Sequence, residues 1–222
     1  MKLPGIITVD PADEELAIKL AHMGGDAFLE ELWTVELLNA LPAGSRGTDR
    51  ERTISRAIIM NDIIVGAPYQ AVYCLEDASA LAIGYLKSDL EGLTWSYLEE
   101  KAERNLIDTV LSEEEAVAYA AQLERMAPIS VFDWEERAGE GGDFIHFAML
   151  AVDPGKRGTG RFRKLVTPFF DYADEHGIPC YLETYSDSLQ SLYEHVGFEV
   201  YRVFESSDFA ITERAMVRKP RK

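Results

Sequence analysis

Apolar residues form their longest run at positions 144–152, FIHFAMLAV. A run of this length without a formal charge predicts a strand that is covered on both faces. Between Phe162 and Ala173 the apolar positions recur at three- and four-residue spacing, which predicts a helix that ends at Gly177. Further apolar patterns predict a strand at 179–184, a short helix at 187–196, and strands at 198–204 and 209–217.

The first part of the chain shows shorter patterns. Residues 6–9 predict a strand, and Asp10-Pro11 predicts the N-cap and first turn of the following helix. Two apolar runs around EDAS predict a hairpin over 70–86. Helices are also expected at 29–41 and 49–64, on either side of the breaker LPAGSRG.

Residues 87–143 differ from the rest because they predict helices between strands. One helix is expected at 94–107, and a second begins at Ser112, where Glu115 has the spacing of a capping box. The element order as a whole predicts an α/β fold, with antiparallel pairing at the C-terminal end of the sheet.

Composition narrows the class of protein. The chain has 222 residues, of which 47% are hydrophobic and 27% charged, as in a water-soluble globular domain. No apolar run is long enough for a membrane span, and the start MKLPGIITVDP makes a poor signal peptide. Cys74 and Cys180 predict buried thiols in a reducing compartment. We therefore expect a cytoplasmic protein with no membrane partner.

The charge is unevenly placed. Residues 1–143 carry 28 Asp and Glu against 11 Lys and Arg, whereas residues 144–222 carry 11 of each. This argues against a nucleic-acid partner, because the phosphate backbone requires cations along its track. It is compatible with a cationic ligand, and equally with an acidic surface that water solvates.

One basic stretch stands out in this acidic chain. AVDPGKRGTGRFRKL, at 151–165, gathers five Lys and Arg with three glycines between the apolar strand and the next helix. Backbone amides at such a turn form an anion site. It is not a nucleoside-triphosphate loop, since Arg and Phe follow Gly160 where Lys and Ser or Thr are needed. It is not a dinucleotide loop either, since Arg163 replaces the third glycine.

The loop fits a pyrophosphate cradle of the form Arg/Gln-x-x-Gly-x-Gly/Ala. Val152, Pro154, Arg157 and Gly160 occupy its positions. Residues 182–200, LETYSDSLQSLYEHVGFEV, supply a second segment with a tyrosine on its short helix. On these two segments the sequence resembles the GNAT superfamily of acetyl-CoA-dependent N-acetyltransferases.

A closer resemblance is to the puromycin N-acetyltransferase-like branch. It rests on Pro168 inside the helix after the loop, GIP at 177–179, LET at 182–184 and RKP at 218–220. The resemblance covers 144–222 strongly and 1–86 weakly, and it is absent from 87–143.

The resemblance implies a single GNAT-like domain over 1–222. Its fold would be a mixed, largely antiparallel central sheet flanked by helices, the acyl-CoA N-acyltransferase fold. Residues 144–222 would form the acetyl-CoA-binding core, and 87–143 would be a helical insertion near the acceptor side.

The resemblance also implies contacts with acetyl-CoA as co-substrate, between two splayed strands. Its pantetheine would pair with the backbone of Leu150, Ala151 and Val152, and Arg157 with the neighbouring cations would neutralise its phosphates. Its pyrophosphate would bind amides of Gly158, Thr159, Gly160, Arg161 and Phe162. Arg161 and Phe162 depart from the family pattern, which has an apolar residue followed by Gly or Ala, so we expect the Phe162 ring to crowd this approach.

Acetyl transfer needs an acid, a base and an oxyanion donor. The resemblance makes Tyr193 the acid for the leaving thiolate, with a strand amide near Leu150 as oxyanion donor. Glu183 is the matching base, and His146 or a water chain are alternatives. No metal is implied.

The expected acceptor is a small cationic primary amine, and a homodimer is possible from the family alone. A non-catalytic acyl-CoA-binding regulatory module on the same fold is the alternative function, and a nucleotide-binding protein is a third.

Overall fold

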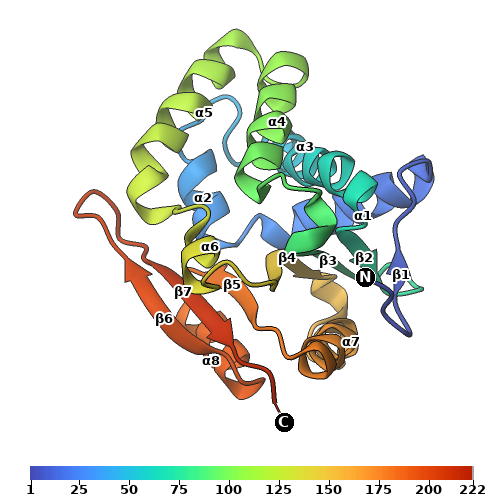
Figure 1. Ribbon diagram of the computed structural model, residues 1–222. Helices are drawn as coiled ribbons and strands as arrows, with labels where there is room; N and C mark the ends of the chain where they lie inside the picture. The colour runs from blue at the N-terminus through green and yellow to red at the C-terminus, as the bar shows by residue number, and fades with distance from the viewer. Residues whose placement is uncertain (222) are drawn as a thin grey trace.

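A single seven-stranded sheet organises the computed structural model, which describes residues 1–221 (Figure 1). The strand order is β1-β2-β3-β4-β5-β7-β6. Every neighbouring pair is antiparallel except β4 and β5, which run parallel. The strands are β1 (Ile7–Thr8), β2 (Val72–Cys74), β3 (Ala80–Leu86), β4 (Ile145–Val152), β5 (Cys180–Thr184), β6 (Glu199–Phe204) and β7 (Glu213–Arg218). The expected mixed, largely antiparallel α/β sheet is confirmed.

Helices cover both faces of this sheet. They are α1 (Glu14–Phe28), α2 (Leu32–Leu38), α3 (Asp49–Gly66), α4 (Trp95–Thr109), α5 (Glu113–Met126), α6 (Trp134–Ala138), α7 (Arg161–His176) and α8 (Asp187–His195). Short 3-10 turns lie at Ala67–Tyr69, Lys87–Leu90, Ala127–Ile129 and Pro154–Lys156. None of the helices within residues 1–221 is long and apolar enough to cross a membrane.

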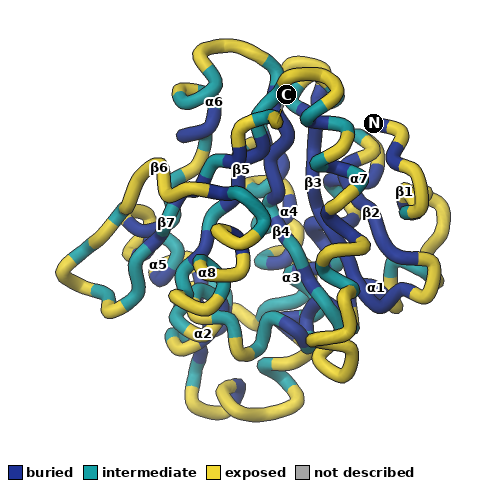
Figure 2. Tube along the Cα trace, turned by 90° about the horizontal axis from the view of Figure 1, so that it is seen from below, coloured by how far each residue is buried: buried dark blue, intermediate teal, exposed yellow. Residues whose placement is uncertain are grey.

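Successive side chains along the strands point to opposite faces of the sheet, and this separates two hydrophobic cores. Val72 and Cys74 pack with residues of α1, α3 and α4 on one face, whereas Tyr73 packs with residues of α7 on the other. The central strands are buried and the edge strand β6 is largely exposed, as the colouring in Figure 2 shows. The helices on both faces therefore bury the middle of the sheet.

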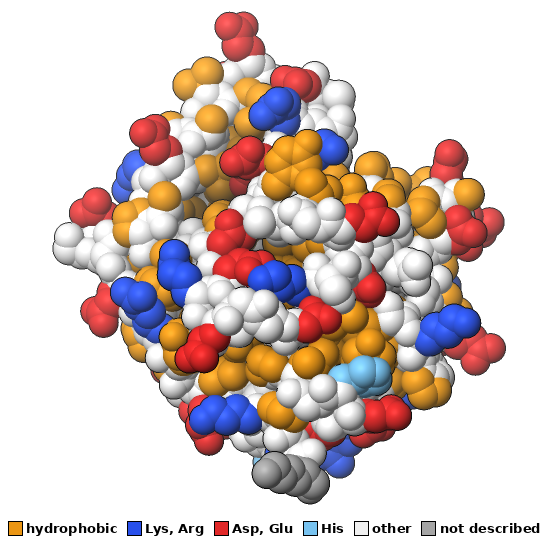
Figure 3. Space-filling model, viewed as in Figure 1, with side chains coloured by type: hydrophobic (Ala, Val, Ile, Leu, Met, Phe, Trp, Pro, Cys, Tyr) orange, Lys and Arg blue, Asp and Glu red, His pale blue; other side chains and the backbone are white. Residues whose placement is uncertain are grey.

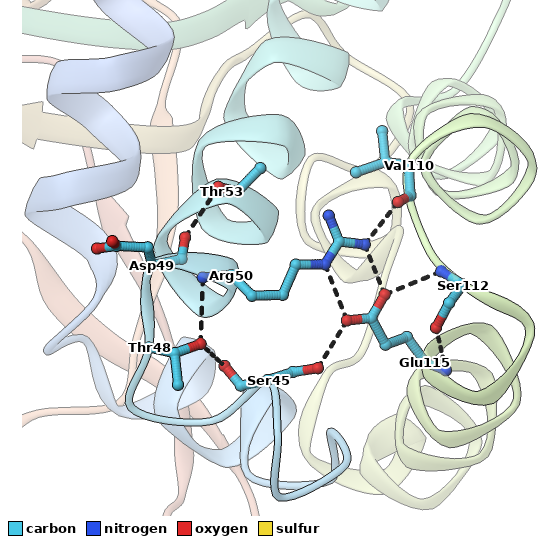
Figure 4. A network of polar contacts seen from close by, with 8 residues as sticks. All are labelled: Ser45, Thr48, Asp49, Arg50, Thr53, Val110, Ser112 and Glu115. Atoms are coloured by element: carbon cyan, nitrogen blue, oxygen red, sulfur yellow. Dashed lines mark hydrogen bonds and ion pairs between the residues drawn. The ribbon is translucent and has the colours of Figure 1, made fainter.

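The helices α4, α5 and α6 occupy the segment between β3 and β4, on the side of the sheet away from α7 (Figure 1). A buried carboxylate ties them to the N-terminal helices: Glu115 accepts from Arg50 Nε at 2.9 Å and from Ser45 Oγ at 2.7 Å (Figure 4). Arg50 also donates to the carbonyl of Val110. The division into an acceptor-side insertion and a coenzyme-binding core stays a prediction.

Local capping was predicted with mixed success. The capping box of Ser112 and Glu115 is present. The predicted start at Asp10-Pro11 is wrong, because Asp10 caps a preceding turn and Asp13 caps α1. Helix α6 was missed, because its five residues lie in a polar stretch that ends in glycines.

The separation of β4 from β5 positions the candidate site. Their ladder covers only Ile145 to Phe147 of β4, although β4 continues to Val152 against β3. A register shift opposite Ile83 and Gly84 makes Ala148 an extra residue in β4. Such a bulge bends a strand, and it lies where the two strands part.

Candidate active site

A cavity of about 1040 Å³ passes through the opening between β4 and β5. One end is lined by the glycine loop and the first turn of α7, and the other by helices α3 and α4. Leu150, Ala151 and Val152 line it beyond the last β4–β5 pair. The cavity therefore joins the predicted coenzyme residues to the insertion helices.

The loop end presents free amides. Gly158 and Gly160 have φ of 75° and 80°, a region that glycine enters without strain. Gly160 begins α7 with no side-chain cap. Consequently the amides of Gly158, Gly160, Arg161, Phe162 and Arg163 donate to no acceptor among the described residues. Unpaired amides at a helix N-terminus form an anion site.

Three predicted loop residues are partly engaged elsewhere. The Thr159 amide donates to the carbonyl of Lys156 at 3.3 Å, and Thr159 does not line the cavity. Arg157 donates to the carbonyl of Ala27 at 3.1 Å. Arg161 pairs with Asp77 at 2.8 Å, in the turn between β2 and β3. The free amides are thus the strongest anion-binding feature of the loop.

Phe162 lies on the inner side of α7. Its ring packs against the core cluster beneath that helix, with its centroid 6.0 Å from that of Tyr193. The sequence suggested that this ring crowds the approach to the loop. Packing against the core anchors the ring, and the Phe162 amide has no acceptor within residues 1–221.

Tyr193 projects from α8 into the same cavity. The residue is only 6% exposed, and burial raises its pKa well above the ordinary value for tyrosine. Its hydroxyl is therefore protonated at neutral pH and can donate a proton or a hydrogen bond.

Glu183 and His146 form a pair between β5 and β4. His146 Nε2 lies 3.0 and 2.9 Å from the two carboxylate oxygens of Glu183, and Trp134 Nε1 donates to the same carboxylate. Burial alone would lower the pKa of His146, but the charges of Glu183 and Glu135 outweigh it and raise that pKa to about 9. The raised pKa favours the protonated imidazole of His146, and the two candidate bases form one hydrogen-bonded unit.

Glu135 completes this cluster from α6. It accepts from Tyr85 Oη at 3.0 Å, and burial raises its pKa. Ligand atoms of Glu135, His146 and Glu183 lie within 4.8 Å of one another, a grouping that could hold a metal ion. Glu183 bonds to His146 and Trp134, and Glu135 bonds to Tyr85, whereas His146 Nδ1 is buried without a hydrogen-bond partner among the described residues.

The far end of the cavity is acidic. Asp62 on α3 and Glu99 and Glu103 on α4 line it, whereas Glu31 and Glu213 line the cavity nearer Tyr193 and Glu183. Sequence reasoning missed these residues. Asp62 interrupts the apolar stretch IIMNDIIVG, and this was a usable signal, since a charge on a buried helix face requires a reason.

On the face drawn in Figure 3, acidic side chains are spread out, with Lys and Arg between them. On this face the acidic groups therefore have basic neighbours, whereas the cavity's Lys and Arg all lie on the glycine loop and the first turn of α7.

Comparisons with known proteins agree with this geometry. The model of the acetyltransferase (GNAT) family matches residues 72–198, more than half of the chain. Two uncharacterised N-acetyltransferases of Schizosaccharomyces pombe are 36% identical over 53 residues and 39% identical over 56 residues. These matches span 24% and 25% of this chain and only 22% and 23% of those proteins.

Solved structures share the fold over the whole chain. An arylalkylamine N-acetyltransferase from Aedes aegypti superposes with a TM-score of 0.59 at 13% identity, over 97% of this chain and 98% of that one. A polyamine N-acetyltransferase from Drosophila melanogaster gives 0.52 at 12% identity, over 96% and 98%. At these identities the likeness establishes the fold alone. With the family match over β2 to α8, it follows that the chain belongs to the acetyltransferase (GNAT) family.

Proposed function

We propose that this protein transfers an acetyl group from acetyl-CoA to a small, cationic primary amine, by direct attack in a ternary complex. The observation that carries the proposal is the polarity of the cavity. Free amides and cations line one end, carboxylates line the other, and Tyr193 and Glu183 also line it.

The loop end suits the donor. The free amides of Gly158 and of Gly160 to Arg163 would bind the pyrophosphate, and Lys156 and Arg163 on the cavity wall would add positive charge. The unpaired edge of β4 beyond Phe147 offers backbone groups to the pantetheine amides, at Leu150, Ala151 and Val152. In this arrangement Arg157 and Thr159 support the loop more than they contact the ligand.

The acid and base follow from their surroundings. Glu183 would accept the proton of the incoming ammonium group, and the protonated His146 holds its carboxylate in place. A strand amide near Leu150 would stabilise the oxyanion that develops on the acetyl carbonyl. Tyr193, protonated because it is buried, would give its proton to the departing thiolate.

The acceptor class follows from the acidic end. An arylalkylamine N-acetyltransferase and a polyamine N-acetyltransferase share this fold, and their names state that they act on amines. In this chain the cavity carboxylates favour a cationic acceptor over a neutral or anionic one. The membership of the puromycin N-acetyltransferase-like branch, a homodimer and a cytoplasmic location stay predictions.

The test is thiol release from acetyl-CoA with a panel of cationic, neutral and anionic acceptors, for the wild type and Tyr193→Phe. We expect turnover with cationic primary amines and a loss of about 100-fold in kcat for Tyr193→Phe, with acetyl-CoA binding retained. Binding of acetyl-CoA without turnover of any acceptor would instead identify the non-catalytic regulatory module. Turnover with neutral or anionic acceptors alone would refute the proposed acceptor class.

A further inference from the structure

An unpaired carboxylate lies at the acidic end of the cavity. Asp62 is only 7% exposed, and its side chain lines the cavity from α3. It has no hydrogen-bond donor and no ion-pair partner within the described part of the chain. Burial, together with Glu99 and Glu103, raises the pKa of Asp62, so the group keeps its proton unless a cation beside it favours the ionised form.

Two further carboxylates stand beside it. Glu99 and Glu103 are four residues apart on α4 and therefore share one face of that helix. Glu99 accepts one hydrogen bond, from Trp95 Nε1 at 2.7 Å, and Glu103 has none. We call Asp62, Glu99 and Glu103 the acidic trio.

Among residues 1–221, no Lys or Arg pairs with the acidic trio, although His146 acts on Glu99 from the neighbouring pair. The Lys and Arg that line the cavity are Lys156, Arg157, Arg161 and Arg163, all at the loop end. The neutral neighbours offer little more, because Asn61 is engaged by Asn105 and by the Ala57 carbonyl. The trio thus has acceptor atoms for several donors and receives one.

The trio lies beyond the Glu183–His146 pair along the cavity. Glu99 connects the two groups, because its charge acts on His146 and also on Asp62. The pair stands on the sheet, and the trio stands on the helices that cover it. A ligand whose amine reaches Glu183 therefore extends toward the trio with its other end.

We propose that the acidic trio is a second cation subsite, which binds the distal ammonium group of a diamine while its other amino group is acetylated. The inference rests on the proposed function and narrows its acceptor. An alkylammonium group carries a positive charge and three N–H donors, and the trio lines the cavity with acidic groups that lack enough protein donors. A monoamine leaves the trio uncompensated, and so gains less from the same cavity.

The test compares terminal diamines of three to six carbons with the n-alkylamines of the same length, by steady-state thiol release from acetyl-CoA. In the wild type we expect kcat/KM for the preferred diamine to exceed that of its monoamine by about 10-fold or more. Asp62→Asn and Glu103→Gln should each reduce this ratio by about 10-fold. Asp108→Asn, an exposed position on the same helix, should leave the ratio unchanged.

Thermal unfolding measures diamine binding to the subsite without requiring turnover. With coenzyme A present, diamines should raise the unfolding midpoint of the wild type and of Asp108→Asn, and raise that of Asp62→Asn much less. Equal kcat/KM for diamines and monoamines, or stabilisation by Mg²⁺ and not by diamines, would overturn the second subsite and leave the acetyltransferase standing. If no amine is acetylated, the proposed function fails, and the diamine shift alone decides whether the trio binds cations.

Discussion

At the residue scale, Gly160 has the clearest local constraint. It begins α7 with φ of 80°, and a Cβ added there meets no atom within 4 Å. The cost of a side chain is therefore in the backbone alone, roughly 1 kcal/mol for a non-glycine residue in this region. Gly160→Ala should lower the unfolding midpoint by a few degrees.

Gly160→Ala should also weaken ligand binding, because a rotated first turn of α7 changes the direction of the Arg161 and Phe162 amides. We expect Gly160→Ala to weaken acetyl-CoA binding about 10-fold or more in calorimetry. Gly155→Ala is the matched control in the same loop, where a Cβ contacts only Asp153 Oδ1, at 3.4 Å. Unchanged affinity in Gly160→Ala would show that these amides do not bind the ligand.

Some residues of the candidate site can be predicted from a sequence pattern, and others cannot. Gly158, Gly160 and Tyr193 lie in short segments whose spacing carries the signal, so the loop and its tyrosine could be predicted. Trp134 and Glu135 come from a five-residue helix and meet β5 only through the tertiary fold. Local periodicity cannot report such contacts, and for this reason the network around Glu183 was only partly foreseen.

At the element scale, strands and long helices follow from periodicity, and the opening between β4 and β5 does not. Apolar runs predicted both strands, yet the ladder ends after Phe147 because of where Ala148 bulges. A bulge leaves no regular signature in one sequence. The shape of the cavity therefore depends on how β4 pairs with β3 and β5, which one sequence does not reveal.

The attachment of α5 to α3 makes a prediction about the insertion helices. The Arg50 guanidinium, more than burial, sets the pKa of Glu115, which it holds well below the ordinary value. Arg50→Met would leave this carboxylate buried and unpaired, and should destabilise the fold by about 3 kcal/mol in denaturant titrations.

A matched control lies two residues away. Arg52 is 51% exposed, and its contacts with Asp26 and Asp49 are 3.6 and 3.9 Å, so Arg52→Met should cost less than about 1 kcal/mol. Equal losses for the two variants would mean that the Arg50–Glu115 pair does not hold α5 in place.

At the scale of the whole molecule, the acidic cavity sets the pH dependence of stability. Burial raises the pKa of Glu103 to about 7 and that of Glu213 to about 8, and the pKa of His146 is raised to about 9. The folded protein therefore keeps protons that the unfolded chain releases. This contribution is complete below the unfolded pKa values and is lost as pH rises through the folded ones.

We expect the free energy of unfolding to fall from about pH 5 to about pH 9, with roughly 3 kcal/mol from His146 alone. At the acid end, the lowered pKa values of Glu115 and Asp174 act in the opposite sense, and their stabilisation is lost below about pH 4. Denaturant titrations across this range test the profile. Glu213→Gln should flatten the decline between about pH 5 and 8, and an unaltered decline would show that Glu213 does not hold the extra proton.

The central claim is that the opening between β4 and β5, with its free amides at Gly158 to Arg163, binds acetyl-CoA. Thermal unfolding of the wild type with saturating acetyl-CoA, and separately with ATP, tests it most directly. At 100 times the dissociation constant, acetyl-CoA should add about 2.7 kcal/mol and raise the midpoint by roughly 5 to 10 °C, while ATP should have little effect. No shift with acetyl-CoA, or an equal shift with ATP, would contradict the account.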